Sequence, residues 1–215
     1  DLKARASSSR MNTYEKIARK DGYRLIAGVD EVGRGPLAGP VVAAAVVFPP
    51  DYVNADIKDS KKLTAAKREK LFSIIEKDSL AVGMRVVDVD VIDRVNILQA
   101  SLQAMRDSVL ELSVSPDFIL VDGVHRVPII TPQKPLIKGD NLSISIAAAS
   151  IMAKVTRDHI MEMYHRQFPH YNFLKNKGYG TKEHLDAIRK FGICKIHRKS
   201  FHVKNLNQIS FEFNV

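Results

Sequence analysis

Four acidic residues stand where apolar, strand-like runs end at or near a glycine. They are Asp30, Glu31, Asp122 and Asp140. Two neighbouring carboxylates about 4 Å apart repel by roughly 4 kcal/mol at an effective dielectric of about 20, and a bound cation reverses that term. Strand ends at one edge of an α/β sheet are a common place for ligand sites. Oxygen ligands without a cysteine or histidine cluster favour Mg²⁺ or Mn²⁺, so the acids predict a divalent-metal site.

Asp30 and Glu31 are adjacent, which limits how a strand can present them. Neighbouring side chains on a strand point to opposite faces, so a regular strand cannot direct both carboxylates to one place. A bend near Gly33 would have to redirect one of them, or Glu31 contributes through its backbone carbonyl or from the rim of the site. A solvated strand end is the alternative interpretation of such an acid pair.

A glycine-rich turn, Gly33-Arg34-Gly35-Pro36, follows the two acids and separates two apolar runs. Glycine lets backbone N–H groups approach a ligand closely. The turn is not a Walker loop, because Arg34 and Gly35 stand where that motif needs Lys and Ser or Thr. The spacing of Gly33, Gly35 and Gly39 is one residue too long for the dinucleotide fingerprint.

Residues 30–40, Asp-Glu-Val-Gly-Arg-Gly-Pro-Leu-Ala-Gly-Pro, resemble the signature of type 2 ribonucleases H, specifically bacterial ribonuclease HII. The Gly-Arg-Gly triplet favours this family over the related ribonuclease HIII. The resemblance covers about residues 22–202. Its other matching segments are Asp59-Ser60-Lys61, Leu120-Val121-Asp122-Gly123, Lys138-Gly139-Asp140, Ala148 to Asp158, Gly178-Tyr179-Gly180-Thr181 and His197-Arg198-Lys199-Ser200-Phe201.

The resemblance implies an endoribonuclease that hydrolyses the RNA strand of RNA/DNA hybrids and cleaves 5′ to single ribonucleotides in duplex DNA. It assigns Asp30, Glu31, Asp122 and Asp140 as catalytic ligands of two Mg²⁺ or Mn²⁺ ions. Asp30 is the expected bridging ligand, and the products carry 5′-phosphate and 3′-hydroxyl ends. Two such ions serve the attacking and leaving oxygens of an in-line displacement.

The resemblance also implies a substrate-binding set, in which the glycine turn and a tyrosine read the RNA–DNA junction. The set is Gly33, Arg34, Gly35, Ser60, Lys61 and Tyr179. Asp158 is a further candidate at the metal site, because it lies in a matching segment. The alternative is that Asp158 is a helix-surface acid paired with Lys154 one turn earlier.

The elements that must position these residues alternate between strands and helices, which indicates an α/β fold. We expect a ribonuclease H-like mixed β-sheet flanked by helices, with a small C-terminal helical appendage. Strands are expected at 24–30, 40–48, 80–87 and 118–121, with a β-like stretch at 128–137. Helices are expected at 11–20, after Thr64, at 90–112, at 143–168 and at 182–191. The expected division is a leader (1–21), flexible or a short helix, a catalytic domain (22–168) and a basic C-terminal region with its tail (169–215).

The charge of the chain favours a polyanionic partner. Its 33 Lys and Arg against 24 Asp and Glu give a net charge of +9, which is typical of nucleic-acid-binding proteins. We expect Lys61, Lys62, Lys182 and residues 197–199 to contact phosphates, although excess lysine can also serve solubility alone. The seven histidines lack metal-ligand spacing and are expected at the surface or at phosphates.

Cys194 is the only cysteine, so the chain has no internal disulfide, and this fits a reducing compartment. No run approaches the roughly 20 apolar residues of a membrane span, and no signal peptide is visible. We therefore expect a cytoplasmic monomer with no membrane association. Residues 208–213 loosely resemble a sliding-clamp-binding peptide, but the alternation of apolar residues there favours an edge strand.

Two other function classes compete with ribonuclease HII. Another two-metal nuclease or integrase of the same fold would keep the four acids but not the Gly-Arg-Gly triplet. A non-catalytic nucleic-acid-binding module would tolerate loss of the acids. Metal-dependent cleavage of duplex DNA that contains one ribonucleotide distinguishes the three classes.

Overall fold

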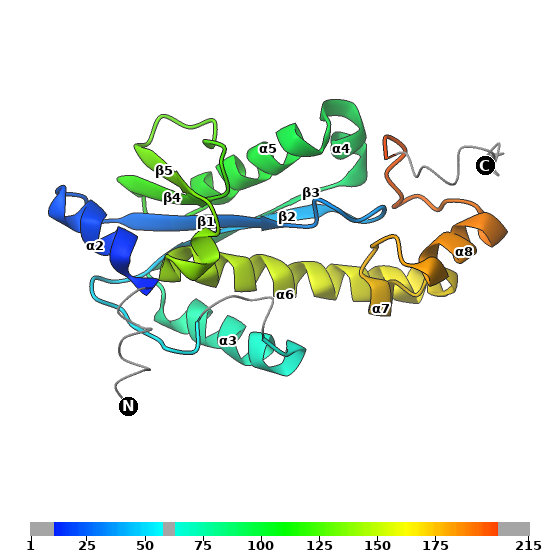
Figure 1. Cartoon of the computed structure of the whole chain (residues 1–215), viewed down its shortest axis with the longest axis horizontal. Coiled ribbons are helices and arrows are strands. Elements are labelled where there is room, and N and C mark those ends of the chain that lie inside the picture. Colours follow the sequence, from blue (N-terminus) through cyan, green and yellow to red (C-terminus); the bar gives the residue numbers. More distant parts are fainter. Residues whose placement is uncertain (1–10, 58–62, 202–215) are drawn as a thin grey trace.

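A five-stranded mixed β-sheet forms the centre of the molecule (Figure 1). The computed structural model describes residues 11–57 and 63–201. The strands are β1 (Ile26–Val32), β2 (Val41–Val47), β3 (Ala81–Val87), β4 (Phe118–Asp122) and β5 (Gln133–Leu136), in the order β3-β2-β1-β4-β5. β1, β2 and β3 pair antiparallel, whereas β4 and β5 continue the sheet in parallel with β1. The mixed α/β sheet expected from the sequence is confirmed.

The composition of β1 and β2 explains their central position. Every residue of β2, Val-Val-Ala-Ala-Ala-Val-Val, is buried, and so are the first five residues of β1. Continuous apolar runs are typical of strands that are covered on both faces. Because β1 lies between β2 and β4, its acidic end belongs to the middle of the sheet and not to an edge.

Helices cover both faces of the sheet. In Figure 1, α6 (Ile144–Gln167) lies below the sheet with α3 (Ala65–Asp78) outside it, and α4 (Val89–Val95) and α5 (Ile97–Leu110) lie above. Ser143 caps α6 by accepting a hydrogen bond from the N–H of Ile146. Thr64 caps α3 in the same way through the N–H of Lys67. Both helices therefore begin where the sequence predicts.

Small residues let α6 approach β1 very closely. A Cβ atom added to Gly28 would lie 2.1 Å from the carbonyl carbon of Ser145, so no side chain fits at this point. Ala147, Ala148 and Ala149 of the same helix are fully buried. The helix therefore packs closely on the sheet, which brings α6 side chains within reach of the acidic end of β1.

The C-terminal region packs a smaller core against the far end of α6. It contains the 3-10 turn η3 (Pro169–Tyr171), α7 (Phe173–Asn176) and α8 (Lys182–Phe191). The helix expected at 182–191 is α8, and Thr181 caps it. Its buried cluster includes Ala38 from the connection between β1 and β2 and Met161 from α6. The appendage is thus in direct contact with the segment that follows the glycine turn.

Two expected elements differ from the structure. The helix predicted at 90–112 is two helices, because Asn96 has a φ of 72°, which interrupts a right-handed helix. The side chain of Asn96 accepts a hydrogen bond from the N–H of Gln99 and so starts α5. The β-like stretch at 128–137 is reduced to β5, because the amide of Gln133 bonds the backbone of Val127 and Ile129 and holds them in a loop.

The helix expected at 11–20 is α2 (Thr13–Lys20). Several expectations concern residues outside the described ranges. These are the leader 1–10, Ser60, Lys61, Lys62 and the tail from 202 to 215 with its clamp-like segment. Among the described helices, none has the length and apolar character needed to cross a membrane.

Replacing Gly28 by alanine tests the contact between β1 and α6. The new methyl group would collide with helix backbone, which cannot move aside as a flexible side chain can. We expect the free energy of unfolding to fall by about 3 kcal/mol in chemical denaturation. In the control Gly180→Ala, the methyl group would lie 3.1 Å from the end of the Leu37 side chain, and a loss below about 1 kcal/mol is expected. Similar losses in both variants would contradict a rigid contact.

Candidate active site

Asp30 and Asp122 lie next to each other at the ends of two parallel strands. β1 and β4 are paired as far as Val29 and Val121, and the two acids are the next residue of each strand. Oδ1 of Asp122 accepts a hydrogen bond of 2.7 Å from the N–H of Gly139. This bond holds the turn η2 (Gly139–Asn141) against the end of β4.

Asp140 lies in η2, directly after the glycine that is bound to Asp122. It is 4% exposed, and its Oδ1 accepts a hydrogen bond of 2.8 Å from Nδ2 of Asn141. The turn leads straight into α6. The structure therefore places Asp140 at the same end of the sheet as Asp30 and Asp122.

Asp30 and Glu31 face opposite sides of the sheet. Asp30 pairs with Ala44, which packs with residues of α6, whereas Glu31 pairs with Ala43, which packs with residues of α5. The ladder between these two described strands continues regularly to Val32, without the bend that would redirect one acid. Among the expected alternatives, the structure favours a position of Glu31 at the rim.

Neighbouring carboxylates disfavour the ionised forms of Asp30 and Glu31. Asp30 is 6% exposed, and its pKa is raised well above its usual value by burial and then by the carboxylates of Glu31 and Asp122. The hydroxyl of Ser150 on α6 and the N–H of Glu31, at 2.7 Å, donate hydrogen bonds to Asp30 and oppose this shift. Burial also raises the pKa of Glu31, while the guanidinium of Arg34, 3.3 Å from its Oε1, lowers it.

Buried carboxylates that repel one another suit a hard divalent cation. Such an ion would stabilise their ionised forms, and oxygen ligands fit Mg²⁺ or Mn²⁺. Within residues 11–57 and 63–201, however, no three Asp, Glu, His or Cys side chains stand ready to enclose a metal ion.

Glu31 lines a pocket of about 240 Å³ between β1 and α5. Its polar wall is formed by Glu31, Arg34, Ser101, Asp122 and His125. Its apolar wall is formed mainly by Leu98, Leu102, Met105 and Val124. The pocket can therefore accept a group that is polar on the side of the acids and apolar on the side of α5.

A buried arginine from the C-terminal region holds the glycine turn. The guanidinium of Arg198, which is 3% exposed, donates to the carbonyls of Gly33, Arg34 (2.9 Å) and Gly39 (2.8 and 3.0 Å). Its backbone N–H donates to the carbonyl of Leu37 at 2.9 Å. Burial lowers the pKa of Arg198 to about 9, so it is charged at neutral pH. One rigid fork of donors thus fixes the shape of the turn.

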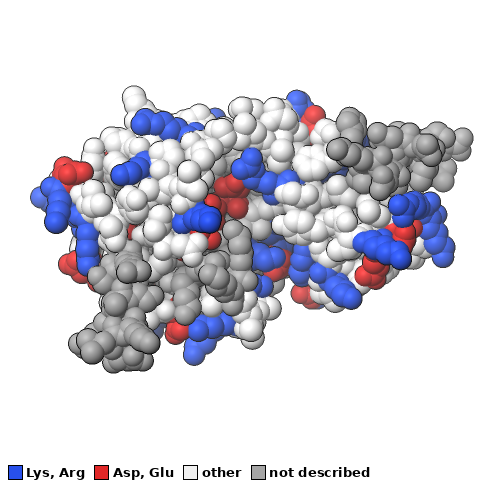
Figure 2. All heavy atoms as spheres, in the orientation of Figure 1, with Lys and Arg blue, Asp and Glu red and all other residues white. Residues whose placement is uncertain are grey.

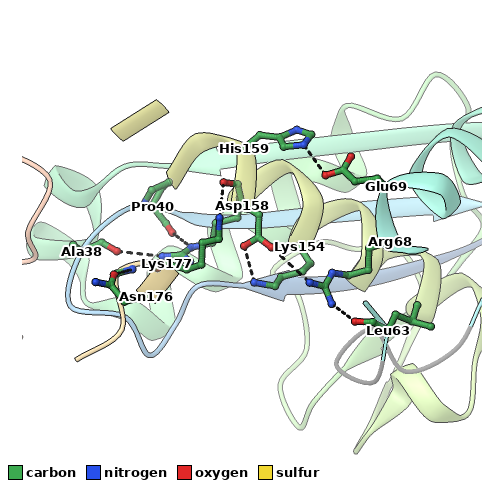
Figure 3. Close-up of polar contacts among 12 residues, drawn as sticks. Ala38, Pro40, Leu63, Arg68, Glu69, Lys154, Asp158, His159, Asn176 and Lys177 are labelled. Atoms are coloured by element: carbon green, nitrogen blue, oxygen red, sulfur yellow. Dashed lines mark hydrogen bonds and ion pairs between the residues drawn. The ribbon is translucent and has the colours of Figure 1, made fainter. Parts of the chain in front are cut away.

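A second buried arginine, Arg157 of α6, holds the segment that follows. It donates to the carbonyls of Ala38 (3.1 Å), Pro40 (2.9 Å) and Lys177 (2.9 Å), and Figure 3 shows these three residues together. Arg157 therefore joins α6, the β1–β2 connection and the appendage. Both arginines lie in segments that match the family, but their buried roles were not predicted, and nothing in their local sequence distinguishes them from surface arginines.

Tyr179 lies against the glycine turn. Cε1 of its ring is 3.5 Å from the position that a Cβ atom would take on Gly35, and the residue is 45% exposed. The N–H of Leu37 donates to the carbonyl of Gly178 at 2.8 Å, which joins the backbones of the two loops. The turn and Tyr179, both predicted to bind substrate, therefore form one surface.

Asp158 forms ion pairs with its own helix and with α3. Its carboxylate lies 2.6 Å from Nζ of Lys154 and 3.9 Å from Nη2 of Arg68 (Figure 3). Arg68 also donates to the carbonyl of Leu63 at 2.6 Å. The pair with Lys154 is the alternative weighed for this acid, and the structure favours it over a role at the metal site.

His184 and His197 are buried, which corrects the expectation that the histidines lie at the surface or at phosphates. Their exposures are 0% and 3%, and their Nε2 atoms are 3.0 Å apart. Burial lowers the pKa of both, that of His197 to about 4. In the segment 197–199, His197 and Arg198 bind the protein itself, so the expectation of phosphate contacts is wrong for these two. Lys199 remains exposed.

Lys and Arg side chains are spread over the face shown in Figure 2, and some of them border an acidic patch near its centre. Lys182, which is expected to contact phosphate, is exposed at the start of α8. This distribution fits a polyanion that crosses this face.

A family model described as ribonuclease HII matches residues 27–204. The match includes the four acids, the glycine turn and both buried arginines. The chain belongs to the ribonuclease HII family. A ribonuclease HII of Syntrophus aciditrophicus is 62% identical over 202 residues, which cover 94% of this chain and 95% of the relative. The family resemblance noted from the motifs is confirmed, and the chain is a type 2 ribonuclease H.

Solved structures of related ribonucleases share the fold. A ribonuclease H2 of Pyrococcus horikoshii matches with a TM-score of 0.69 and 27% identity, over 82% of this chain and 93% of that chain. The ribonuclease HII of Archaeoglobus fulgidus, solved in complex with PCNA, has a TM-score of 0.69 at 23% identity, over 84% and 96%. Bst ribonuclease HIII in complex with Mn²⁺ has a TM-score of 0.58 at 21% identity, over 81% and 65%. The last two support the fold alone.

The buried histidines predict a pH dependence of stability. The pKa of His197 is about 4 in the folded protein against a usual 6.5, so between these values the unfolded chain binds more protons. The stability from the neutral ring is present above pH 6.5 and is lost as the pH falls toward 4, by about 3 kcal/mol. Urea denaturation between pH 7 and 4 should therefore show a smaller loss for His197→Gln than for the wild type. Parallel curves for the two proteins would contradict this prediction.

Proposed function

We propose that this ribonuclease HII hydrolyses the RNA strand of RNA/DNA hybrids and cleaves 5′ to single ribonucleotides embedded in duplex DNA, leaving 5′-phosphate and 3′-hydroxyl ends. The observation that carries the proposal is the cluster of Asp30, Glu31 and Asp122 immediately before a turn that Arg198 holds rigid. The acids supply the hydrolytic part of the site, and the turn supplies recognition.

The proposed site holds two Mg²⁺ or Mn²⁺ ions through the four acids. Asp30 is the proposed shared ligand, and Glu31, Asp122 and Asp140 complete the set. When bound, the ions supply an activated water and stabilise charge on the leaving oxygen. Hydrogen bonds from Ser150 and from the N–H of Gly139 orient Asp30 and Asp122, two of the four proposed ligands.

Recognition of a ribonucleotide requires contact with the 2′-hydroxyl, which is the group that distinguishes RNA from DNA at a given site. Gly33 and Gly35 leave room for their backbone to approach that hydroxyl. The exposed ring of Tyr179 beside Gly35 can stack on the adjacent sugar or base. We infer that the appendage covers the RNA–DNA junction from the side opposite the acids.

A non-catalytic nucleic-acid-binding module is the competing function. The net charge of +9 fits both functions. Burial of several mutually repelling carboxylates, however, destabilises a fold unless the charges are compensated. A module that only binds would gain nothing from keeping them, whereas a hydrolytic site needs their oxygen atoms.

Replacing Asp30 by asparagine separates the two functions. The amide has the same shape but no charge, so it cannot serve as a shared metal ligand. We expect cleavage of an RNA/DNA hybrid under Mg²⁺ to fall by at least about 10², because each 1.36 kcal/mol of lost stabilisation costs tenfold. The free energy of unfolding should stay equal or rise, since the repulsion with Glu31 and Asp122 is removed.

The same variant tests metal binding without a cleavage assay. In thermal denaturation with increasing Mn²⁺, the midpoint of the wild type should rise and that of Asp30→Asn should rise much less. A variant that cleaves at the wild-type rate would refute the site assignment. Equal Mn²⁺ stabilisation of both proteins would show that the ions bind elsewhere.

Replacing Tyr179 by alanine tests recognition of the junction. Stacking on one base or sugar contributes about 1–3 kcal/mol, so cleavage at a single embedded ribonucleotide should fall roughly tenfold. Affinity for an all-DNA duplex at the same salt concentration should change much less. Phe191→Ala is the matched control, because it removes another exposed aromatic ring of the appendage. Equal losses of cleavage and of duplex affinity would make Tyr179 a general DNA contact.

A further inference from the structure

Three hydrogen bonds connect Cys194 to Tyr179 through the two buried histidines. The backbone N–H of Cys194 donates to Nδ1 of His197 at 2.9 Å. The Nε2 atoms of His197 and His184 are 3.0 Å apart, and Nδ1 of His184 lies 2.9 Å from the carbonyl oxygen of Tyr179. These four residues are called the histidine relay below.

One assignment of protons satisfies all three bonds with neutral rings. A backbone N–H can only donate, so Nδ1 of His197 accepts and the proton of that ring is on Nε2. The Sγ (3.2 Å) and the carbonyl oxygen (3.3 Å) of Cys194 also lie near this nitrogen, but the carbonyl already accepts the backbone N–H of His197 at 3.0 Å. This Nε2–H donates to Nε2 of His184, whose proton is therefore on Nδ1. The Nδ1–H of His184 then donates to the carbonyl of Tyr179. The donor that sets the direction belongs to the backbone of Cys194.

Aromatic rings enclose the two imidazoles. Tyr171 lies edge-on to His197 at a centroid distance of 4.9 Å, and Phe173 lies edge-on to His184 at 5.3 Å. A ring nitrogen without a partner is costly in such apolar surroundings. Reversing one tautomer would place two donors or two acceptors opposite each other, so the relay holds its carbonyl acceptor firmly.

The segment that carries His197 also fixes the glycine turn. Ala38 and His197 form an isolated β-bridge, and the next residue, Arg198, binds the carbonyls of Gly33 and Arg34. The carbonyl of Tyr179 additionally accepts the N–H of Thr181 at 2.8 Å. The segment His197-Arg198 therefore holds two parts of the site. His197 holds the backbone of Tyr179 through His184, and Arg198 holds the glycine turn that the Tyr179 ring contacts.

We propose that His184 and His197 are positioning residues, which fix the backbone of Tyr179 so that its ring lies against the glycine turn where the ribonucleotide binds. The inference rests on the proposed role of Tyr179 in recognition. Neither histidine touches the substrate; both act through the carbonyl of Tyr179. Disturbing the relay therefore lowers turnover at an embedded ribonucleotide and leaves the affinity for plain duplex DNA unchanged.

Nitrogen-15 NMR of the imidazole rings in the full-length protein tests the relay directly. At pH 7 we expect the Nδ1–H form for His184 and the Nε2–H form for His197, both neutral. An Nε2–H form of His184, or a charged form of either ring, would overturn the relay. The result does not depend on cleavage, so it separates failure of the relay from failure of the proposed role of Tyr179.

Two substitutions of His184 test whether the hydrogen bond to the carbonyl of Tyr179 matters, or only the packing of the ring. Asparagine carries an N–H near the position of Nδ1 and can still reach the carbonyl of Tyr179, whereas glutamine carries it near the position of Nε2 and cannot. We expect kcat at a single embedded ribonucleotide to fall roughly tenfold or more in His184→Gln. His184→Asn should recover most of it, and both variants should bind all-DNA duplex as the wild type does. Equal losses in the two variants would assign His184 a packing role only.

Substitutions of His197 provide an independent arm if a His184 variant folds poorly. Glutamine can donate to Nε2 of His184 from the position of the lost ring nitrogen, but leucine cannot. In His197→Gln, His184 should keep its Nδ1–H form and kcat should stay near the wild-type value. In His197→Leu, both should be lost. Retention of the Nδ1–H form in the leucine variant would show that His197 does not set the tautomer.

Discussion

The burial of Asp30 in the middle of the sheet is the constraint on which the rest of the structure depends. A carboxyl group there loses its hydration and is repelled by the carboxylates of Glu31 and Asp122, so its ionised form needs compensation. Part of it comes from the hydroxyl of Ser150, which reaches Asp30 because Gly28 lets α6 lie against β1. The small residues of the core are therefore needed by the site as well, because they bring α6 close enough to donate a hydrogen bond to a buried acid.

Two buried arginines hold the glycine turn, and their positive charges also need compensation for lost hydration. Arg157 and Arg198 are desolvated, as their lowered pKa values of about 10 and about 9 indicate. Their guanidinium groups are satisfied by backbone carbonyls, which only one conformation of residues 33–40 presents together. The desolvation cost is thus linked to loop conformation: if the turn rearranged, it would leave buried donors without acceptors. The turn is consequently rigid before any substrate binds.

Local patterns made much of this structure predictable. Continuous apolar runs indicated β1 and β2, and the cap residue Thr64 marked the start of a helix, because these signals depend on neighbours in sequence. The acids were found from strand ends and from the family motif. The orientations of Asp30 and Glu31 were not decided, since they depend on whether the strand bends. The roles of Arg198 and His197 were missed, because their partners are far away in sequence and such polar side chains are usually exposed.

The proposed hydrolytic and recognition parts meet at Gly33, two residues after Glu31. Its φ of 101° suits glycine, and a Cβ atom there would lie 2.3 Å from Nε of Arg157, so backbone conformation and space both require this residue. The end of β1 is fixed by the sheet, and Gly33 is fixed by Arg198. The offset between the acids and the turn is therefore built into one short rigid segment. Under the proposed function, the turn reads a 2′-hydroxyl while the acids act on a neighbouring phosphate, so this fixed offset selects one phosphodiester bond relative to the ribonucleotide.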